Sequence, residues 1–430
     1  MKVIILAGGI GKRMDPIKQD KLLLKFLGKP FFEYVLESLS AFDNFIIVAS
    51  PTNKDSLQEI THKLNLNAEF VIQEAAEGMA DAVLKARDLI DGEVMIVNAD
   101  DLSEPEVFTE VISKAKNSDA EVVLAGKEME KYFPGGYLKV SGDSAEDIVE
   151  KPGEGNEPSK LVRMAVDYFK DGKKLLEYLQ NSHSDKDDVY EAALNQMIQE
   201  GSKVVVSEYA GSWVSLKYPW HVLQVMKYFL KNISGKRGDN VFVSPKAHVD
   251  ENVVLENGVK VFDGASIKGP CYIGKNVVVG NNALVRESIV QDHCVIGYST
   301  EIARSYVGEN SWFHTNYVGD SILEGDFGMG SGAVLANLRL DGQTVRVGEE
   351  KIDSNLEKLG LIAGKGVRVG VNASTMPGVR VGKNSLIGPS VILYKDVEEG
   401  KKVLLKQEHS IEENSDSVTS YDQFRGEFEK

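Results

Sequence analysis

The sequence predicts a two-domain protein in which an α/β domain is followed by an all-β domain. The chain has 430 residues, which is more than one ordinary hydrophobic core accommodates. Over residues 1–230, short apolar runs alternate with amphipathic stretches, which is typical of an α/β sheet. Over residues 244–396, apolar residues instead recur about every six positions, the period of a parallel β-helix built from hexapeptide repeats.

The α/β domain opens with the apolar run KVIIL at residues 2–6. Later apolar runs are near-continuous, as expected for strands covered on both faces: NFIIVAS (44–50), AEFVIQE (68–74), EVMIVNAD (93–100) and AEVVLAG (120–126). We expect a mostly parallel sheet with helices on both faces, which binds ligands at the carboxyl ends of its strands. The loops after residues 6, 73 and 100 are therefore the candidates for a site.

The composition limits the partners of the protein. It has 65 acidic and 49 basic residues, a formal net charge of −16. Such a surface repels nucleic acid and anionic membranes, so a phosphate site must be locally basic. Two cysteines, Cys271 and Cys294, are too few for a disulfide framework, and KVIIL is too short for a signal peptide. We expect a cytoplasmic protein.

A glycine-rich loop follows the first strand. Gly8, Gly9 and Gly11 are followed by the cations Lys12 and Arg13. Glycines let the backbone turn sharply and bring N–H groups close to an anion, and fixed cations add the charge that a phosphate needs. This pattern predicts a nucleotide-phosphate loop. Its spacing is neither G-x-G-x-x-G nor a P-loop, so the alternative is a glycine turn in an ordinary α/β domain.

The run LAGG-x-G-K-R-M, continued by Lys21 in DKLLLKFLGKP, resembles the signature of the sugar-1-phosphate nucleotidylyltransferases. The resemblance implies a Rossmann-like domain in which Leu6, Ala7 and the three glycines bind the nucleotide. It also implies that Arg13 and Lys21 hold the triphosphate and the transition state. The implied reaction is in-line attack of a sugar 1-phosphate on the α-phosphorus of an NTP, with release of pyrophosphate.

Further motifs follow in the order of this family. The resemblance implies that Gln73 and Gly78 bind the base and that Asp100 binds Mg²⁺. It implies that the sugar is bound by Gly136, Glu150 and Lys151. Asp101 is a second candidate for the metal, since carboxylate oxygens are suited to Mg²⁺. Taken singly, each has an ordinary alternative: a surface glutamine, a helix cap after a strand, or a charged turn.

Two positions depart from the family pattern. Arg163-Met164-Ala165 stands where the family has Asn, a small residue and Gly, and Ser215 stands where it has an aspartate or asparagine that completes the metal site. A serine hydroxyl is a weaker Mg²⁺ ligand than a carboxylate. The alternative to an active enzyme is therefore a regulatory paralogue that binds an NDP-sugar and catalyses poorly.

The segment HTNYVGDSILEGDFGMGSGAVLANLRLDG (314–342) resembles the acetyltransferase half of the bifunctional N-acetylglucosamine-1-phosphate uridylyltransferases. This resemblance implies a left-handed β-helix, a homotrimer and acetyl-CoA as co-substrate. It assigns His314 as the general base and Tyr317 and Asn337 as sugar contacts. The expected phosphate-binding lysine is Ala303, and an expected asparagine is missing near Gly328. Retention and loss of acetyl transfer therefore both stay open.

The composition also predicts the boundaries. A nucleotidyltransferase domain would span residues 1–230, a linker 231–243, an acyltransferase-like β-helix 244–396 and an acidic tail 397–430. Within the β-helix, residues 338–358 interrupt the six-residue period and are expected to loop out. The tail is low in apolar residues, so a short helix or disorder is expected there.

Overall fold

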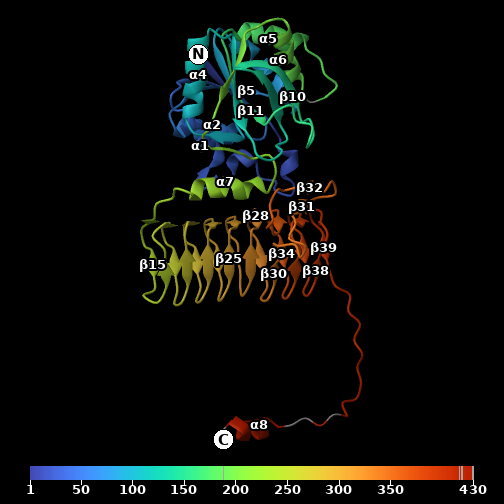
Figure 1. Ribbon diagram of the computed structural model, residues 1–430. Coiled ribbons are helices and arrows are strands. Elements are labelled where there is room, and N and C mark those ends of the chain that lie inside the picture. The colour runs from blue at the N-terminus through green and yellow to red at the C-terminus, as the bar shows by residue number, and fades with distance from the viewer. Residues whose placement is uncertain (187, 416, 418–419, 429–430) are drawn as a thin grey trace.

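The computed structural model describes residues 1–186, 188–415, 417 and 420–428. An α/β domain stands on a long parallel β-helix, and helix α7 (His221–Leu230) lies between the two (Figure 1). In the part of the chain that is described, no helix is long and apolar enough to cross a membrane.

The first domain is built on a nine-stranded sheet in the order β5-β4-β1-β6-β11-β8-β12-β10-β9. Its strands are β1 (Lys2–Ala7), β4 (Asn44–Ala49), β5 (Asn67–Ile72), β6 (Val94–Asn98), β8 (Val122–Glu128), β9 (Gly136–Ser141), β10 (Ser144–Glu150), β11 (Leu161–Phe169) and β12 (Val204–Glu208).

The sheet is mixed, although the sequence predicts a mostly parallel one. Strands β5, β4, β1 and β6 are mutually parallel, and β8 is parallel to β12. Strand β11 is antiparallel to both β6 and β8, and β9 and β10 form an antiparallel hairpin. An apolar run indicates that a strand is buried, but it does not indicate the direction of the strand. The sequence pattern therefore could not distinguish parallel from antiparallel pairing.

Helices cover both faces of this sheet, as the sequence predicts. They are α1 (Phe31–Ser38), α2 (Lys54–Lys63), α3 (Gly78–Lys85), α4 (Glu106–Ser118), α5 (Gly172–Asn181), α6 (Val189–Gln199) and α7. Alternate residues of β1 enter different clusters: Val3 and Ile5 pack with α1, α4 and α7, whereas Ile4 packs with α3, α5 and α6.

Short elements complete the domain, most of them near the carboxyl ends of β1 and β6. They are η1 (Lys12–Met14), η2 (Lys21–Leu23), the β2 (Lys25–Phe26)–β3 (Lys29–Pro30) hairpin, η3 (Arg87–Leu89), β7 (Asp101–Ser103) and β13 (Trp213–Ser215). Strand β13 pairs antiparallel with β7, so that Ser215 lies opposite Asp101.

The second domain is a coil of two- and three-residue strands stacked into three parallel sheets. The first sheet contains β14 (Lys236–Arg237), β17 (Val253–Leu255), β20 (Cys271–Ile273), β23 (Ile289–Val290), β26 (Tyr306–Val307), β28 (Ile322–Leu323), β33 (Ile362–Ala363) and β36 (Arg380–Val381). The second contains β16 (His248–Val249), β19 (Ser266–Lys268), β22 (Leu284–Arg286), β25 (Glu301–Ala303), β27 (Tyr317–Gly319), β30 (Val334–Leu335), β35 (Ser374–Thr375) and β38 (Ile392–Leu393). The third contains β15 (Phe242–Val243), β18 (Lys260–Val261), β21 (Val278–Val279), β24 (Val295–Ile296), β29 (Gly328–Met329), β34 (Arg368–Val369), β37 (Leu386–Ile387) and β39 (Lys402–Val403), with Trp312 bridging its two parts.

The six-residue period of the sequence corresponds to the core of this coil. Side chains that recur at this interval are buried inside it: Val253, Val259, Ala265, Cys271, Val277 and Ala283. The coil begins at β14, inside the range expected to be a linker, and β39 extends it past residue 396. Residues 338–358 leave the coil as expected and form the antiparallel β31 (Arg346–Val347)–β32 (Ile352–Asp353) hairpin. The tail contains α8 (Tyr421–Phe428).

The first sheet of the β-helix packs against the α/β domain. Tyr272, Ile289, Tyr306 and other outward residues of this sheet belong to the same hydrophobic cluster as α1 and α7. The ring of Phe26 lies 5.6 Å from that of Tyr306 and 5.3 Å from that of Phe229 on α7, measured between centroids. The two domains therefore share one continuous apolar core.

Candidate active sites

A cavity of about 470 Å³ opens at the carboxyl ends of β1 and β6. It brings together every first-domain residue that the sequence proposed for the site. These residues are Leu6, Ala7, Gly8, Gly9, Gly11, Arg13, Lys21, Gln73, Gly78, Asp100, Gly136, Glu150 and Lys151. Side chains that are distant in sequence thus converge on one space, as expected for a mixed α/β sheet.

The glycine-rich loop has the geometry that glycine requires at two positions. Gly11 lies in the left-handed region, with φ 61°, immediately before η1. A Cβ on Gly8 would lie 2.4 Å from Oε1 of Gln73, so only glycine lets the loop approach this side chain. The loop therefore lies directly against Gln73 at Gly8.

Lys21 is held at a defined distance from the end of β1. Asp20 caps η2 by accepting a hydrogen bond from the N–H of Leu22 at 2.9 Å. The amide of Asn53 donates both to Asp20 Oδ2 at 2.8 Å and to the carbonyl of Ala7 at 2.9 Å. These contacts connect the Lys21 segment to β1 and direct its ammonium group into the cavity.

The Lys21 ammonium forms an ion pair with the Asp100 carboxylate. Burial acts to raise the pKa of Asp100, but the ammonium groups of Lys21 and Lys217 outweigh burial and hold that pKa below its usual value. Asp100 is therefore ionised at neutral pH. Sequence analysis did not identify Lys217, which lines the cavity two residues after Ser215.

The oxygen atoms beside Asp100 fit a hard divalent cation. Oδ1 of Asp101 and Oγ of Ser215 are buried and have no hydrogen-bond partner. Burial raises the pKa of Asp101, and the charge of Lys217 only partly opposes this. Among the described residues, no group of three or more His, Cys, Asp or Glu side chains has metal-binding geometry. Two carboxylates and a hydroxyl would suit Mg²⁺, which usually completes its shell with substrate phosphates and water.

Gln73 lines the cavity and is only 3 % exposed. Its Nε2 donates to the carbonyl of Gly78 at 3.1 Å and to Oδ2 of Asp81 at 2.9 Å. Gly78 begins α3 with φ 92°, again in the region that favours glycine. The glutamine amide is thus held in one orientation, with its oxygen facing Gly8.

Gly136, Glu150 and Lys151 lie together where the β9–β10 hairpin lines the cavity. Gly136 begins β9, and Glu150 ends β10 directly opposite it in the hairpin. Nζ of Lys151 lies 2.7 Å from Oε1 of Glu150. A Cβ on Gly136 would approach Glu150 Oε2 to 3.1 Å, so the glycine leaves room around this carboxylate.

A buried ionic cluster beside Gly136 was not predicted. Arg163 on β11 forms ion pairs with Asp167 on the same strand and with Glu191 on α6. The Tyr190 hydroxyl donates to Asp167 at 3.0 Å, and Nε of Arg163 has no hydrogen-bond partner. Burial raises the pKa of Asp167, against the opposing charge of Arg163. The departure at Arg163 was visible in the sequence, but its partner Glu191 becomes a neighbour only through the fold.

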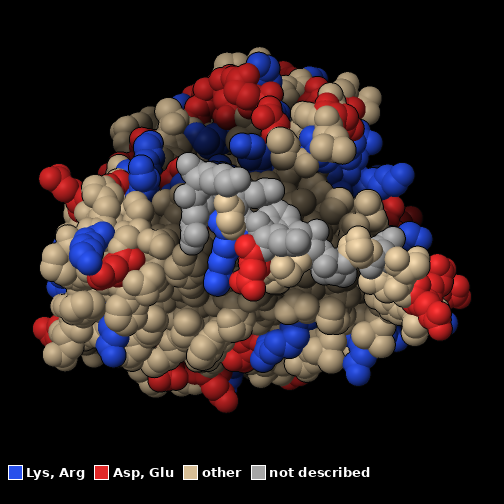
Figure 2. Space-filling view, turned by 90° about the horizontal axis from the view of Figure 1, so that it is seen from below, with Lys and Arg blue, Asp and Glu red and all other residues tan. Residues whose placement is uncertain are grey.

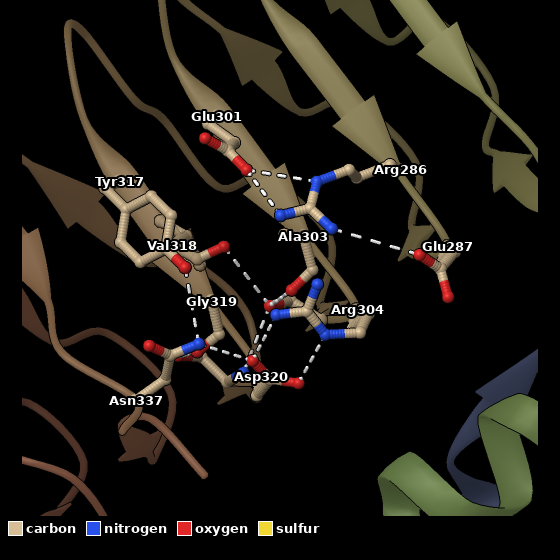
Figure 3. A network of polar contacts seen from close by, with 12 residues as sticks. Arg286, Glu287, Glu301, Ala303, Arg304, Tyr317, Val318, Gly319, Asp320 and Asn337 are labelled. Carbon is tan, nitrogen blue, oxygen red and sulfur yellow. Dashed lines mark hydrogen bonds and ion pairs between the residues drawn. The ribbon is translucent and has the colours of Figure 1, made fainter. Parts of the chain in front are cut away.

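The second candidate site is a polar network on the second sheet of the β-helix (Figure 3). Ala303 lies between Arg286 and Gly319 in the register of β22, β25 and β27. Nε and Nη2 of Arg286 donate to Oε1 of Glu301 at 3.1 and 2.8 Å. A guanidinium group is therefore present on this face, one strand away from the alanine that replaces the expected lysine.

Arg304 supplies a second guanidinium beside Ala303. It donates to both oxygens of Asp320, from Nε at 2.8 Å and from Nη2 at 2.6 Å. The amide of Asn337 donates to the same carboxylate and, at 3.3 Å, to the hydroxyl of Tyr317. Tyr317 and Asn337 are thus brought together, and Asp320, which sequence analysis missed, connects them to Arg304 (Figure 3).

His314 lies at the turn between the third and second sheets. Its backbone N–H donates to Oδ1 of Asn316 at 2.8 Å, and its backbone carbonyl accepts from the hydroxyl of Thr300 at 2.5 Å. These contacts fix the backbone, while the side chain is exposed. Within the described residues, no hydrogen bond joins His314 to Tyr317 or Asn337.

The glycine loop, the Lys21–Asp100 pair and the mixed α/β sheet define a nucleotidyltransferase, here joined to a hexapeptide-repeat domain. The family model described as nucleotidyl transferase matches residues 2–216, and the one described as bacterial transferase hexapeptide (six repeats) matches residues 252–287. The chain belongs to the nucleotidyl transferase family.

Three relatives are similar over nearly the whole chain. A protein named bifunctional protein GlmU from Methanococcus vannielii is 29 % identical, over 96 % of this chain and 100 % of the relative. A protein of the same name from Methanococcus maripaludis is 30 % identical, over 95 % and 98 % of the two chains. A bifunctional sugar-1-phosphate nucleotidylyltransferase/acetyltransferase from Sulfurisphaera tokodaii is 28 % identical, over 88 % and 93 %. The similarity therefore covers both domains.

Proposed function

We propose that residues 1–230 transfer a nucleotidyl group from an NTP to a sugar 1-phosphate, which yields an NDP-sugar and pyrophosphate. The observation that carries the proposal is the convergence of the glycine loop, the Lys21–Asp100 pair and the Glu150–Lys151 pair on one cavity. The full-length similarity to a relative named for the same chemistry supports it.

In this proposal, Arg13 and Lys21 hold the triphosphate while the backbone N–H groups of Gly8, Gly9 and Gly11 contact its oxygens. Glu150 accepts hydrogen bonds from sugar hydroxyls, and Lys151 binds the sugar phosphate. An oxygen of that phosphate attacks the α-phosphorus in line, and no covalent enzyme intermediate is needed. The protein contributes by positioning the reactants and neutralising charge. Gln73 and Gly78 would bind the base.

Mg²⁺ is the cofactor that the donor set fits best. Asp100 would hold it, and the bound ion would neutralise charge on the reacting phosphates.

The β-helix is the proposed site of a second reaction, acetyl transfer from acetyl-CoA to an amino-sugar 1-phosphate. His314 would accept a proton from the attacking amine, while Tyr317 and Asn337 would contact the sugar. In place of the lysine that Ala303 lacks, a sugar phosphate would share Arg286 and Arg304 with their carboxylate partners Glu301 and Asp320. We propose a homotrimer built through the β-helix.

The decisive experiment measures Mg²⁺-dependent pyrophosphate release across a panel of NTPs and sugar 1-phosphates. We expect release with one pair of substrates and its loss in Lys21→Ala, because the ammonium group would no longer neutralise the triphosphate. Lys29→Ala is the matched control, since Lys29 pairs with Glu37 on the surface. A folded protein that binds a nucleotide but releases no pyrophosphate with any pair would instead be a regulatory paralogue.

A further inference from the structure

We propose that Asp101 is a metal ligand of the first domain and replaces the acidic or amide side chain that this chain lacks at Ser215. The inference rests on the proposed function, because it concerns the metal of nucleotidylyl transfer. It assigns the two protein carboxylates of the site to adjacent residues, Asp100 and Asp101.

The pairing of β7 with β13 places the two positions opposite each other. Ser215 is the direct cross-strand partner of Asp101. Opposed residues of an antiparallel pair project from the same face, with Cβ atoms about 4.5–5.5 Å apart. A carboxylate at position 101 therefore reaches nearly the same space as a carboxylate at position 215 would.

The oxygen atoms at this pair have free coordination capacity. Asp101 is 8 % exposed, and its Oδ2 lies 3.5 Å from the amide nitrogen of Asn98. Its Oδ1 and the Ser215 hydroxyl oxygen are both buried without a hydrogen-bond partner. Native structures rarely leave such atoms unpaired, and a bound ion is one of the ordinary explanations. Asp101 lines the same cavity as Asp100, so both carboxylates can reach one cation there.

Mn²⁺ binding to the full-length protein, followed by electron paramagnetic resonance of the free ion, tests the assignment without requiring turnover. We expect Asp101→Asn to weaken Mn²⁺ binding at least tenfold, because the amide removes one of the two charged ligands. Adding Ser215→Asp to this variant should restore the affinity to within about threefold of the original, since it returns a carboxylate from the opposite strand.

Glu104→Gln is the matched control, because Glu104 directly follows β7 and binds Ser212 directly before β13. Glu104 accepts hydrogen bonds from Tyr209 and from the N–H of Ser212, at 2.8 and 3.0 Å. It does not line the cavity, so its loss should leave Mn²⁺ affinity unchanged. An equal loss of affinity in Glu104→Gln and Asp101→Asn would overturn the proposal, because it would show a general effect of disturbing β7 and β13.

Ser215→Asp alone provides a second measurement that does not depend on the folding of Asp101→Asn. Two carboxylates opposite each other repel in the absence of a cation. We therefore expect a lower Tm in EDTA and recovery of that Tm in millimolar Mn²⁺. An unchanged Tm in EDTA, or unchanged Mn²⁺ affinity in Asp101→Asn, would remove Asp101 from the metal site. Metal binding through Asp101 without pyrophosphate release would instead refute the proposed function and leave the ligand assignment intact.

Discussion

Arg163 departs from the family pattern and lines the first cavity beside Gly136. Its guanidinium is buried between two carboxylates from different elements, Asp167 on β11 and Glu191 on α6. Ala165, two residues along, has φ 51° in a strand, at the position where the family has glycine. The backbone there keeps the left-handed conformation although glycine is absent, which indicates that the surrounding packing imposes it.

Removing this guanidinium should destabilise the protein strongly. We expect Arg163→Met to lower the free energy of unfolding by about 3–5 kcal/mol, because Asp167 and Glu191 would remain buried without their cation. Urea unfolding of the full-length chain measures the difference.

Lys160→Met is the control for this prediction, since Lys160 pairs with Glu130 on the surface and their side chains are 66 % and 87 % exposed. Its loss should cost no more than about 1 kcal/mol. If both substitutions cost the same, the Arg163 cluster does not stabilise the fold.

At the scale of elements, the β-helix holds the segment that carries Lys21. Oε1 of Glu324, just after β28, accepts hydrogen bonds from the backbone N–H of Lys18 at 2.8 Å and of Gln19 at 2.5 Å. Its Oε2 accepts from the N–H of Lys365 in the next coil at 2.7 Å. One buried carboxylate thus connects two coils of the second domain to the loop between Arg13 and Lys21.

We therefore expect Glu324→Ala to lower kcat for pyrophosphate release by about tenfold, with a smaller effect on KM, because Lys21 would lose its fixed position. Steady-state kinetics of the full-length protein measures both constants.

Glu324→Gln should recover much of the activity, since its amide oxygen can still accept from residues 18 and 19. Glu309→Ala is the control, because Glu309 is more exposed and lies 3.8 Å from the Lys25 ammonium. Wild-type kcat in Glu324→Ala would show that the contact between the domains does not position Lys21.

Among the helices, strands and loops, features that depend on neighbouring residues were predicted from the sequence, and features that depend on distant segments were not. The glycine loop and the six-residue period were predicted because each depends on residues close together in the chain. The antiparallel direction of β11 was not predicted, because the direction of this strand follows from the path of the chain after the β9–β10 hairpin. The partners of Arg304 and Arg163 were missed for a similar reason, since Asp320 and Glu191 become neighbours only after folding.

At the scale of the whole molecule, one sheet of the β-helix is buried against the first domain and the other two carry exposed apolar side chains. On the third sheet, Phe242 and Trp312 are 48 % and 56 % exposed, and on the second sheet Ile392 is 57 % exposed. The side seen from below has wide uncharged areas between scattered charged residues (Figure 2). We expect an assembly of the chain to bury these exposed side chains.

We expect sedimentation velocity to give a species of about three times the 47.2 kDa chain mass, as in a trimer that buries these faces. Trp312→Lys should shift the protein toward smaller species by placing a charge in the interface. Tyr421→Lys is the control, since Tyr421 is an exposed aromatic residue on α8 in the tail. A monomer at micromolar concentration would contradict the expected assembly.

The sequence by itself determined the two architectures, the glycine loop and many of the residues that line the first cavity. The hydrophobic period and the positions of the glycines involve residues close together in the sequence, so both can be recognised without knowledge of the fold. Only the tertiary structure decided that Ser215 lies opposite Asp101, that Glu324 holds the Lys21 segment, and that Arg163 joins Asp167 to Glu191. These are contacts between distant segments, and they exist because burial of two apolar surfaces brings the segments together.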